Sequence, residues 1–139
     1  MLTALVLGLS LILSACGQEP SFVSYDHSKI VWQGNATERE DFSALYETIQ
    51  DCVGAAANTP TITIVDSESI VCGGADSSGC ASWEDGVIIT RDSFYSSFGR
   101  VLSHEYIHWI LHQGNEIHDT AVMDKCEFIQ LPFVSQPYL

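Results

Sequence analysis

The chain has 139 residues, enough for a single domain, and 46% of them are hydrophobic. Its 18 acidic residues outnumber the 5 lysines and arginines, so the formal net charge is −13 at pH 7. This charge argues against nucleic acid as a partner, because binding to phosphates needs a basic surface. A strongly acidic chain is instead typical of a well solvated, soluble surface.

Residues 1–15 form an apolar run without a charged side chain, too short for a comfortable membrane span and typical of a secretory signal. The run leads into Leu-Ser-Ala-Cys at residues 13–16, which resembles the bacterial lipobox, although the usual basic residues before the run are missing. The resemblance implies that Cys16 is lipidated, for example with palmitate, and that this lipid anchors the protein to the membrane of the cell envelope. Gly17 after the cysteine implies the outer membrane in a Gram-negative cell. The alternatives are a plain N-terminal anchor and a cleaved signal.

The polar residues 16–27 are expected to form a tether to a domain spanning residues 28–139. Residues 29–33 predict a first strand. Thr-Glu-Arg-Glu at residues 37–40 reads as a capping box that opens a helix, and Gly54 ends that helix. Apolar residues recur at helical spacing along one stripe of it, namely Phe42, Leu45, Tyr46, Ile49, Cys52 and Val53.

The middle of the chain predicts two more strands, at residues 61–65 and 86–91, because both runs are rich in β-branched residues. Residues 66–82 between them are expected to form a loop. A second helix is expected to begin between Ser93 and Ser97 and to end at Gln113, before Gly114. Residues 115–130 predict a loop followed by a helical turn, and the proline-containing tail is expected to be an extended strap.

Four cysteines remain once Cys16 is assigned to lipid, and an even number in an exported domain predicts two disulfides. Three pairings are possible. Cys72 and Cys80 flank a short flexible loop and are natural partners, which leaves Cys52 with Cys126. The spacings are not those of a cysteine-ligated zinc.

The second helix contains His-Glu-Tyr-Ile-His at residues 104–108, an HExxH motif. On a helix His104 and His108 lie on one face, so both can reach one metal ion, and Glu105 can reach a water molecule at that ion without being a ligand. The helix is otherwise apolar on nearly every side, which predicts a buried, central helix. Buried imidazoles and a carboxylate are costly unless something satisfies them, and a metal ion would do so.

The order of these elements predicts an α+β domain with a small sheet packed on the HExxH helix. Residues 28–128 resemble the zincin metallopeptidases, and most closely the small bacterial HExxH lipoproteins, on the HExxH motif together with Gly114, His118 and Cys126. The resemblance implies a Zn²⁺ ion held by His104 and His108, with Glu105 as the catalytic acid and base. It also implies that the strand at residues 86–91 forms the sheet edge and pairs with a peptide substrate.

A catalytic zinc generally takes three protein ligands. His112 lies about 12 Å from His104 along the helix axis, too far to share an ion with it. His118 is the first choice, because the chain can turn back after Gly114. Glu127, at a spacing seen in some gluzincins, and Asp119, in the manner of the aspzincins, are the alternatives.

These observations predict a zinc-dependent metallopeptidase at the cell envelope that acts on peptides or proteins. A non-catalytic zincin-like lipoprotein that binds a partner or a metal is the alternative. Tyr106, His112 and Tyr95 are candidates for the group that stabilises the oxyanion.

Overall fold

The computed structural model describes residues 21–97, 99–114, 118 and 120–131. The expected signal at residues 1–15, the lipid site Cys16, the alternative ligand Asp119 and the tail 132–139 therefore lie outside the described part of the chain. Within that part, no helix has both the length and the apolar character that a membrane crossing requires.

A four-stranded sheet forms one layer of the molecule. Its strands follow the order β2-β3-β7-β6, with β3 and β7 parallel and the outer two pairs antiparallel. The middle strands are almost entirely buried, which explains their continuous runs of β-branched residues. The four strands are β2 (Ile30–Asn35), β3 (Thr61–Val65), β6 (Gly79–Ser82) and β7 (Gly86–Thr90).

The edge of this sheet is not the strand expected from the sequence. β7, which was expected to form the edge, lies between β3 and β6. The two edge strands are β2 and β6, and β6 lies in a stretch expected to be a loop. Its sequence, Gly-Cys-Ala-Ser, has no β-branched or aromatic residue, so local preference gives no strand signal, and pairing with β7 alone makes it a strand.

A second, three-stranded sheet is built from β1 (Val23–Ser24), β4 (Ile70–Cys72) and β5 (Ala75–Ser77). β1 pairs with β4, and Val23 is buried. This part of the chain was expected to belong to the polar tether. It belongs to the folded domain instead, because Val23 and Ser24 pair with β4 and the side chain of Val23 is buried.

Helix α1 (Glu40–Val53) buries the predicted stripe, with Phe42, Leu45 and Ile49 in the core. The helix ends before Gly54, as expected. Gly54 adopts the left-handed backbone conformation, with φ 77°, that commonly terminates a helix. The predicted capping box at residues 37–40 is not formed. Asn35 caps a short 3-10 helix at Ala36–Glu38, and Arg39, without a side-chain cap, precedes α1.

The HExxH helix is shorter than expected at both ends. A separate helix α2 (Arg91–Ser96) comes first, and Gly99, with φ 81°, precedes α3 (Arg100–Leu111). At the other end, His112 itself adopts the left-handed conformation with φ 54° and ends the helix before Gly114.

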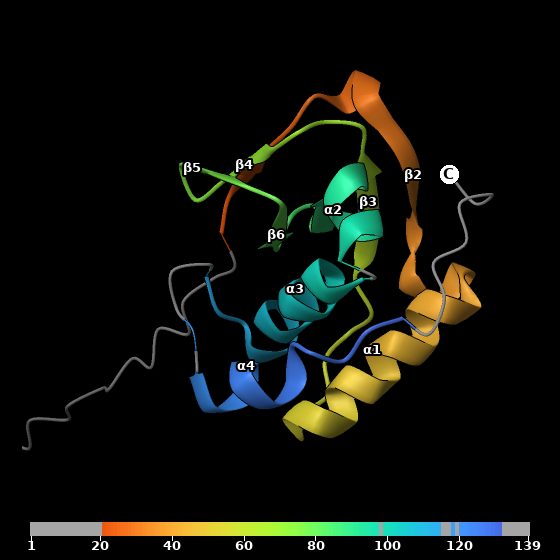
Figure 1. Ribbon diagram of the computed structural model, residues 1–139, viewed down its shortest axis with the longest axis vertical. Coiled ribbons are helices and arrows are strands. Elements are labelled where there is room, and N and C mark those ends of the chain that lie inside the picture. Colours follow the sequence, from red (N-terminus) through yellow and green to blue (C-terminus); the bar gives the residue numbers. More distant parts are fainter. Residues whose placement is uncertain (1–20, 98, 115–117, 119, 132–139) are drawn as a thin grey trace, which may run out of the picture.

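Helix α3 lies in the middle of the molecule, with α1 and α4 (Thr120–Cys126) on one side and the strands on the other (Figure 1). Both expected disulfides are present, Cys52–Cys126 and Cys72–Cys80. The first joins α1 to α4, and the second joins β4 to β6. The fold is therefore α+β, with a small sheet against a central helix, as expected.

Candidate metal centre

Two histidines of α3 form the centre of the site. His104 and His108 lie one helical turn apart, and their Nε2 atoms are 3.1 Å from each other. Their ring centroids are 4.8 Å apart. Tetrahedral bonds of about 2.0–2.1 Å separate two ligand nitrogens by about 3.3 Å, so the pair has close to the spacing that a zinc ion needs.

The third member of the group is His118, which follows the turn after α3. Its ring centroid lies 5.2 Å from that of His104 and 5.1 Å from that of His108. Each of the three side chains offers one nitrogen, and these nitrogens all lie within 4.8 Å of one another. Three histidines in this arrangement could hold a metal ion.

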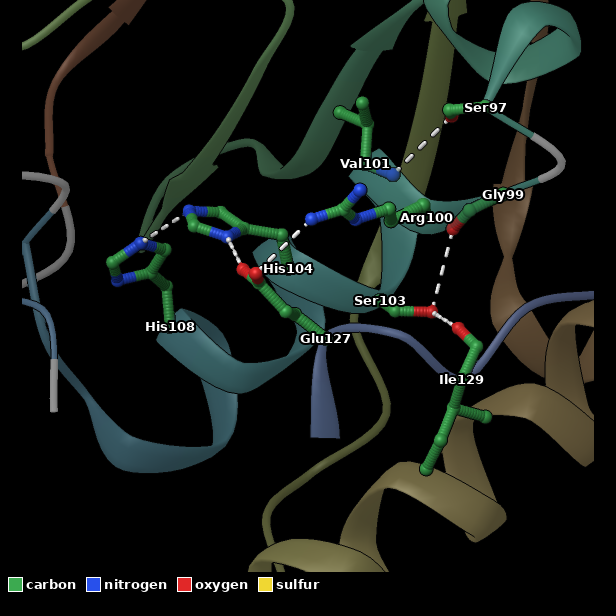
Figure 2. Close-up of polar contacts among 9 residues, drawn as sticks. All are labelled: Ser97, Gly99, Arg100, Val101, Ser103, His104, His108, Glu127 and Ile129. Carbon is green, nitrogen blue, oxygen red and sulfur yellow. Dashed lines mark hydrogen bonds and ion pairs between the residues drawn. The ribbon is translucent and has the colours of Figure 1, made fainter. Parts of the chain in front are cut away.

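Glu127 is placed differently from a third ligand. Its Oε2 atom is 3.2 Å from Nδ1 of His104, the ring nitrogen that does not face His108 (Figure 2). It therefore contacts the candidate ligand His104 on the side of the ring opposite to the nitrogen that faces His108. Its pKa is lowered: partial burial acts to raise it, but hydrogen bonds from His104 and Arg100 outweigh that effect.

His112 turns away from the group, as its position on the helix predicts. Its ring packs against Trp83, with 4.3 Å between the centroids. It thus belongs to an aromatic contact at the far end of β6 and not to the metal centre.

Two of the candidate ligands are held in the neutral form that binds metals. Burial, followed by the neighbouring imidazoles of His104 and His118, lowers the pKa of His108 to about 3. Burial also lowers the pKa of His104, although Glu127 opposes this effect. Neutral imidazole is the form that coordinates a metal, so the lone pairs are available at neutral pH.

Glu105 is the most unusual group of the site. It is only 3% exposed, and burial raises the pKa of its carboxyl to about 8. The backbone N–H of Ala81 on β6 donates a hydrogen bond to this carboxyl. Its Oε2 atom is buried and has no hydrogen-bond partner among the described residues. A buried carboxylate oxygen without a partner is rare and marks a place where a ligand or water is expected.

Gly79 makes room for this carboxylate. A Cβ atom at residue 79 would lie 2.8 Å from Cγ and Oε1 of Glu105 and equally close to Val101. The edge strand can approach the helix this closely only because residue 79 has no side chain. The sequence offered no signal for this contact, because it depends on a strand that was not predicted.

An open cleft of about 690 Å³ lies over these residues, between α3 and the strands β4 to β6. Two of the three histidines, His104 and His118, line this cleft together with Glu105. Gly79, Val101, Arg100 and Glu127 also contribute to its lining.

The residues proposed for an oxyanion role do not line this cleft. The prediction of an oxyanion role for Tyr106 is wrong, because its hydroxyl donates to the backbone oxygen of Phe42 on α1, inside the core. Tyr95 lines a separate surface depression with Asp66 and Arg91, and His112 packs on Trp83.

The fold and the site define an α+β protein with a three-histidine group beside a buried glutamate. No protein-family model, curated protein or solved structure matches this chain. Its function must therefore be argued from the site itself.

Proposed function

We propose that the protein is a zinc-dependent metallopeptidase of the zincin type. One observation carries the proposal: three histidine nitrogens lie within 4.8 Å of one another, beside a buried glutamate next to the first histidine, in an open cleft. A helical HExxH pair with the glutamate as general base is the arrangement of a zinc peptidase. The central helix under a small sheet agrees with the zincin architecture.

His104, His108 and His118 would hold the zinc ion. Three imidazoles with an open fourth position are a common ligand set of catalytic zinc. When bound, the ion supplies a Lewis acid that polarises a peptide carbonyl and lowers the pKa of a water molecule beside Glu105.

Glu105 moves the proton. Its Oε2 atom, which has no partner among the described residues, is free to take a proton from the attacking water and to pass it to the leaving amine. The N–H of Ala81 and the bare backbone of Gly79 hold the carboxyl in place from the other side. A carboxyl with a raised pKa can both accept and return a proton near neutral pH, which suits an acid–base role.

The substrate class is an extended peptide lying along β6. This strand is one edge of the four-stranded sheet, and its first residue, Gly79, lines the cleft beside Glu105. A peptide can bind to such an edge by adding a strand, with main-chain hydrogen bonds giving affinity.

The test is a zinc determination and a peptide-library digest on the purified full-length protein in detergent. We expect close to one zinc per chain and cleavage of peptides by the wild type. Glu105→Gln should retain zinc and lose cleavage. Glu47→Gln, the same change at an exposed position on α1, should retain both zinc and cleavage. A folded protein that takes up no zinc would refute the proposal.

A second candidate is a non-catalytic protein that uses the same scaffold to bind a partner or a metal. One observation favours it: the side chain of Ser77 hydrogen-bonds both the N–H and the C=O of Gly79, so part of the edge strand is already occupied. Under this reading zinc binds but no peptide is cleaved. Ser77→Ala separates the two candidate functions, because it removes the hydrogen bonds that occupy Gly79. If the protein is a peptidase, the variant should cleave peptides faster than the wild type; if it is not an enzyme, neither should cleave peptides.

We further propose that the protein is anchored to the cell envelope by a lipid on Cys16. Two disulfides support an exported protein, because disulfides persist in oxidising compartments. Cys16→Ser should release the protein from membranes during fractionation, and unchanged sedimentation with membranes would contradict the anchor.

A further inference from the structure

The contact between Glu127 and His104 is part of a larger arrangement at the end of α4. Glu127 accepts from both sides: Nδ1 of His104 is 3.2 Å from its Oε2, and Nη2 of Arg100 is 3.2 Å from its Oε1. Arg100 and His104 are themselves one turn apart on α3. Figure 2 shows the carboxylate of Glu127 between these two side chains, with His108 on the far side of the His104 ring.

This contact determines which nitrogen of His104 is available. A carboxylate beside Nδ1 keeps the ring proton on that nitrogen, and this leaves the lone pair on Nε2. Nε2 is the atom that lies 3.1 Å from Nε2 of His108. The position of Glu127 therefore orients the His104 ring toward the other two histidines.

The segment that carries Glu127 is held by covalent and polar contacts. Cys126, the residue immediately before it, forms the disulfide with Cys52 of α1. Two residues after Glu127, the backbone oxygen of Ile129 accepts from the hydroxyl of Ser103 on α3. Leu131 packs close to Gly99. The disulfide and the Ser103 contact thus fix the chain on both sides of Glu127.

We propose that Glu127 is a positioning residue for the metal ligand His104, and that the Cys52–Cys126 disulfide sets the metal affinity by holding Glu127 in place. The proposal rests on metal binding by the three histidines, which is part of the function proposed above, but not on peptide hydrolysis. Arg100 and Glu127 are partly exposed, so their ion pair contributes little to the stability of the fold. Metal affinity is therefore the property that reveals the role.

The first experiment measures the zinc dissociation constant of the full-length, oxidised protein in detergent by competition with a chromophoric chelator. Glu127→Ala should weaken binding by about 10- to 100-fold, the usual effect of losing such a partner. Glu127→Gln keeps an acceptor oxygen and should recover part of the loss. Asp124→Asn removes one charge from the exposed face of the same helix and should leave affinity within about twofold.

A spectroscopic signature adds a second readout. The visible absorption of the Co²⁺-substituted protein should change in Glu127→Ala and return toward the wild-type spectrum in Glu127→Gln. Unchanged affinity and an unchanged spectrum in Glu127→Ala would overturn the positioning role.

The second experiment is a double-mutant cycle between Glu127→Ala and the paired change Cys52→Ser with Cys126→Ser. If the disulfide acts through Glu127, removing it should weaken zinc binding strongly in the wild type and by less than about threefold in Glu127→Ala. Fully additive losses would overturn the coupling. Thermal melting of each metal-free variant checks folding. If the disulfide variant does not fold, a cycle of Arg100→Gln with Glu127→Ala tests whether the other contact of Glu127 acts on zinc affinity through this carboxylate.

The outcomes separate this proposal from the proposed enzymatic function. A wild type that binds zinc without cleaving peptides leaves the positioning role standing. A Glu127→Ala variant with the zinc affinity and the Co²⁺ spectrum of the wild type overturns the positioning role alone.

Discussion

The two faces of α3 differ in how their buried groups are satisfied. On the face toward α1 and the core, Leu102 and Tyr106 are fully buried, and the polar atoms of Tyr106 and Trp109 both have backbone acceptors. On the opposite face, His108 and Glu105 are equally buried, yet Oε2 of Glu105 has no partner among the described residues. The named polar groups of the first face are paired within the protein, whereas the second face leaves a buried oxygen without a partner among the described residues, as is typical of a place where a ligand or water binds.

Removal of the metal should have the largest effect on the stability of the fold, and this effect should depend on the histidines of the second face. At a free zinc concentration of about 1,000 times the dissociation constant, binding stabilises the fold by about 4 kcal/mol, which a chelator removes. Thermal melting with and without chelator measures the difference. His108→Ala is the control, and a melting temperature of that variant that still falls with chelator would contradict a single site at these histidines.

Truncation of the first face should be almost as costly but independent of zinc. Leu102→Ala removes a fully buried side chain from the core and should lower the free energy of unfolding by about 3 kcal/mol. Urea unfolding of the metal-free protein measures this loss. The zinc dissociation constant of the folded variant should remain within about twofold of the wild type, and a larger change would show that the two faces are not separable.

Glu105→Gln should stabilise the metal-free protein at alkaline pH. Burial raises the folded-state pKa of Glu105 to about 8 from its ordinary value of 4.5, so between these values the folded state binds more protons than the unfolded state. Stability is therefore lost as pH rises from 4.5 to 8, at about 1.4 kcal/mol per pKa unit before relaxation of the site.

With that relaxation, the variant should gain about 2–3 kcal/mol over the wild type above pH 8 and nothing at pH 4. Urea unfolding at the two pH values measures it. The exposed Glu47→Gln should show no such gain, and an equal effect of both variants would remove Glu105 from the explanation.

Gly79→Ala should have the smallest effect. The new Cβ atom meets Glu105 and Val101 at 2.8 Å, so the edge strand must shift away from the helix. Overpacking of this kind costs about 1–2 kcal/mol and should also displace the carboxyl of Glu105. Unfolding measurements together with peptide cleavage test it, and a variant with wild-type values for both would show that β6 can move freely.

The sequence was sufficient wherever the determining contacts are local. His104 and His108 meet because a helix brings residues i and i+4 together, and Cys72 pairs with Cys80 across a short loop. The α+β class and the position of His118 also agree with expectation.

The sequence was insufficient where tertiary pairing decides. The residues of β6 have little intrinsic strand preference. They form an edge strand because they pair with the side of β7 that β3 does not occupy. Glu127 has a spacing compatible with a ligand, but α4 and its disulfide place the carboxylate behind the His104 ring. No pattern along the chain encodes that direction of approach.

The short strand β1 has a consequence for where this protein can work. Val23 is fixed in the smaller sheet, and only seven peptide units separate it from Cys16. A fully extended chain of that length reaches about 25 Å, comparable to the width of a small domain. If Cys16 carries the proposed lipid, the domain would stay within about this distance of the bilayer, and the proposed peptidase activity would reach only polypeptides close to the lipid headgroups.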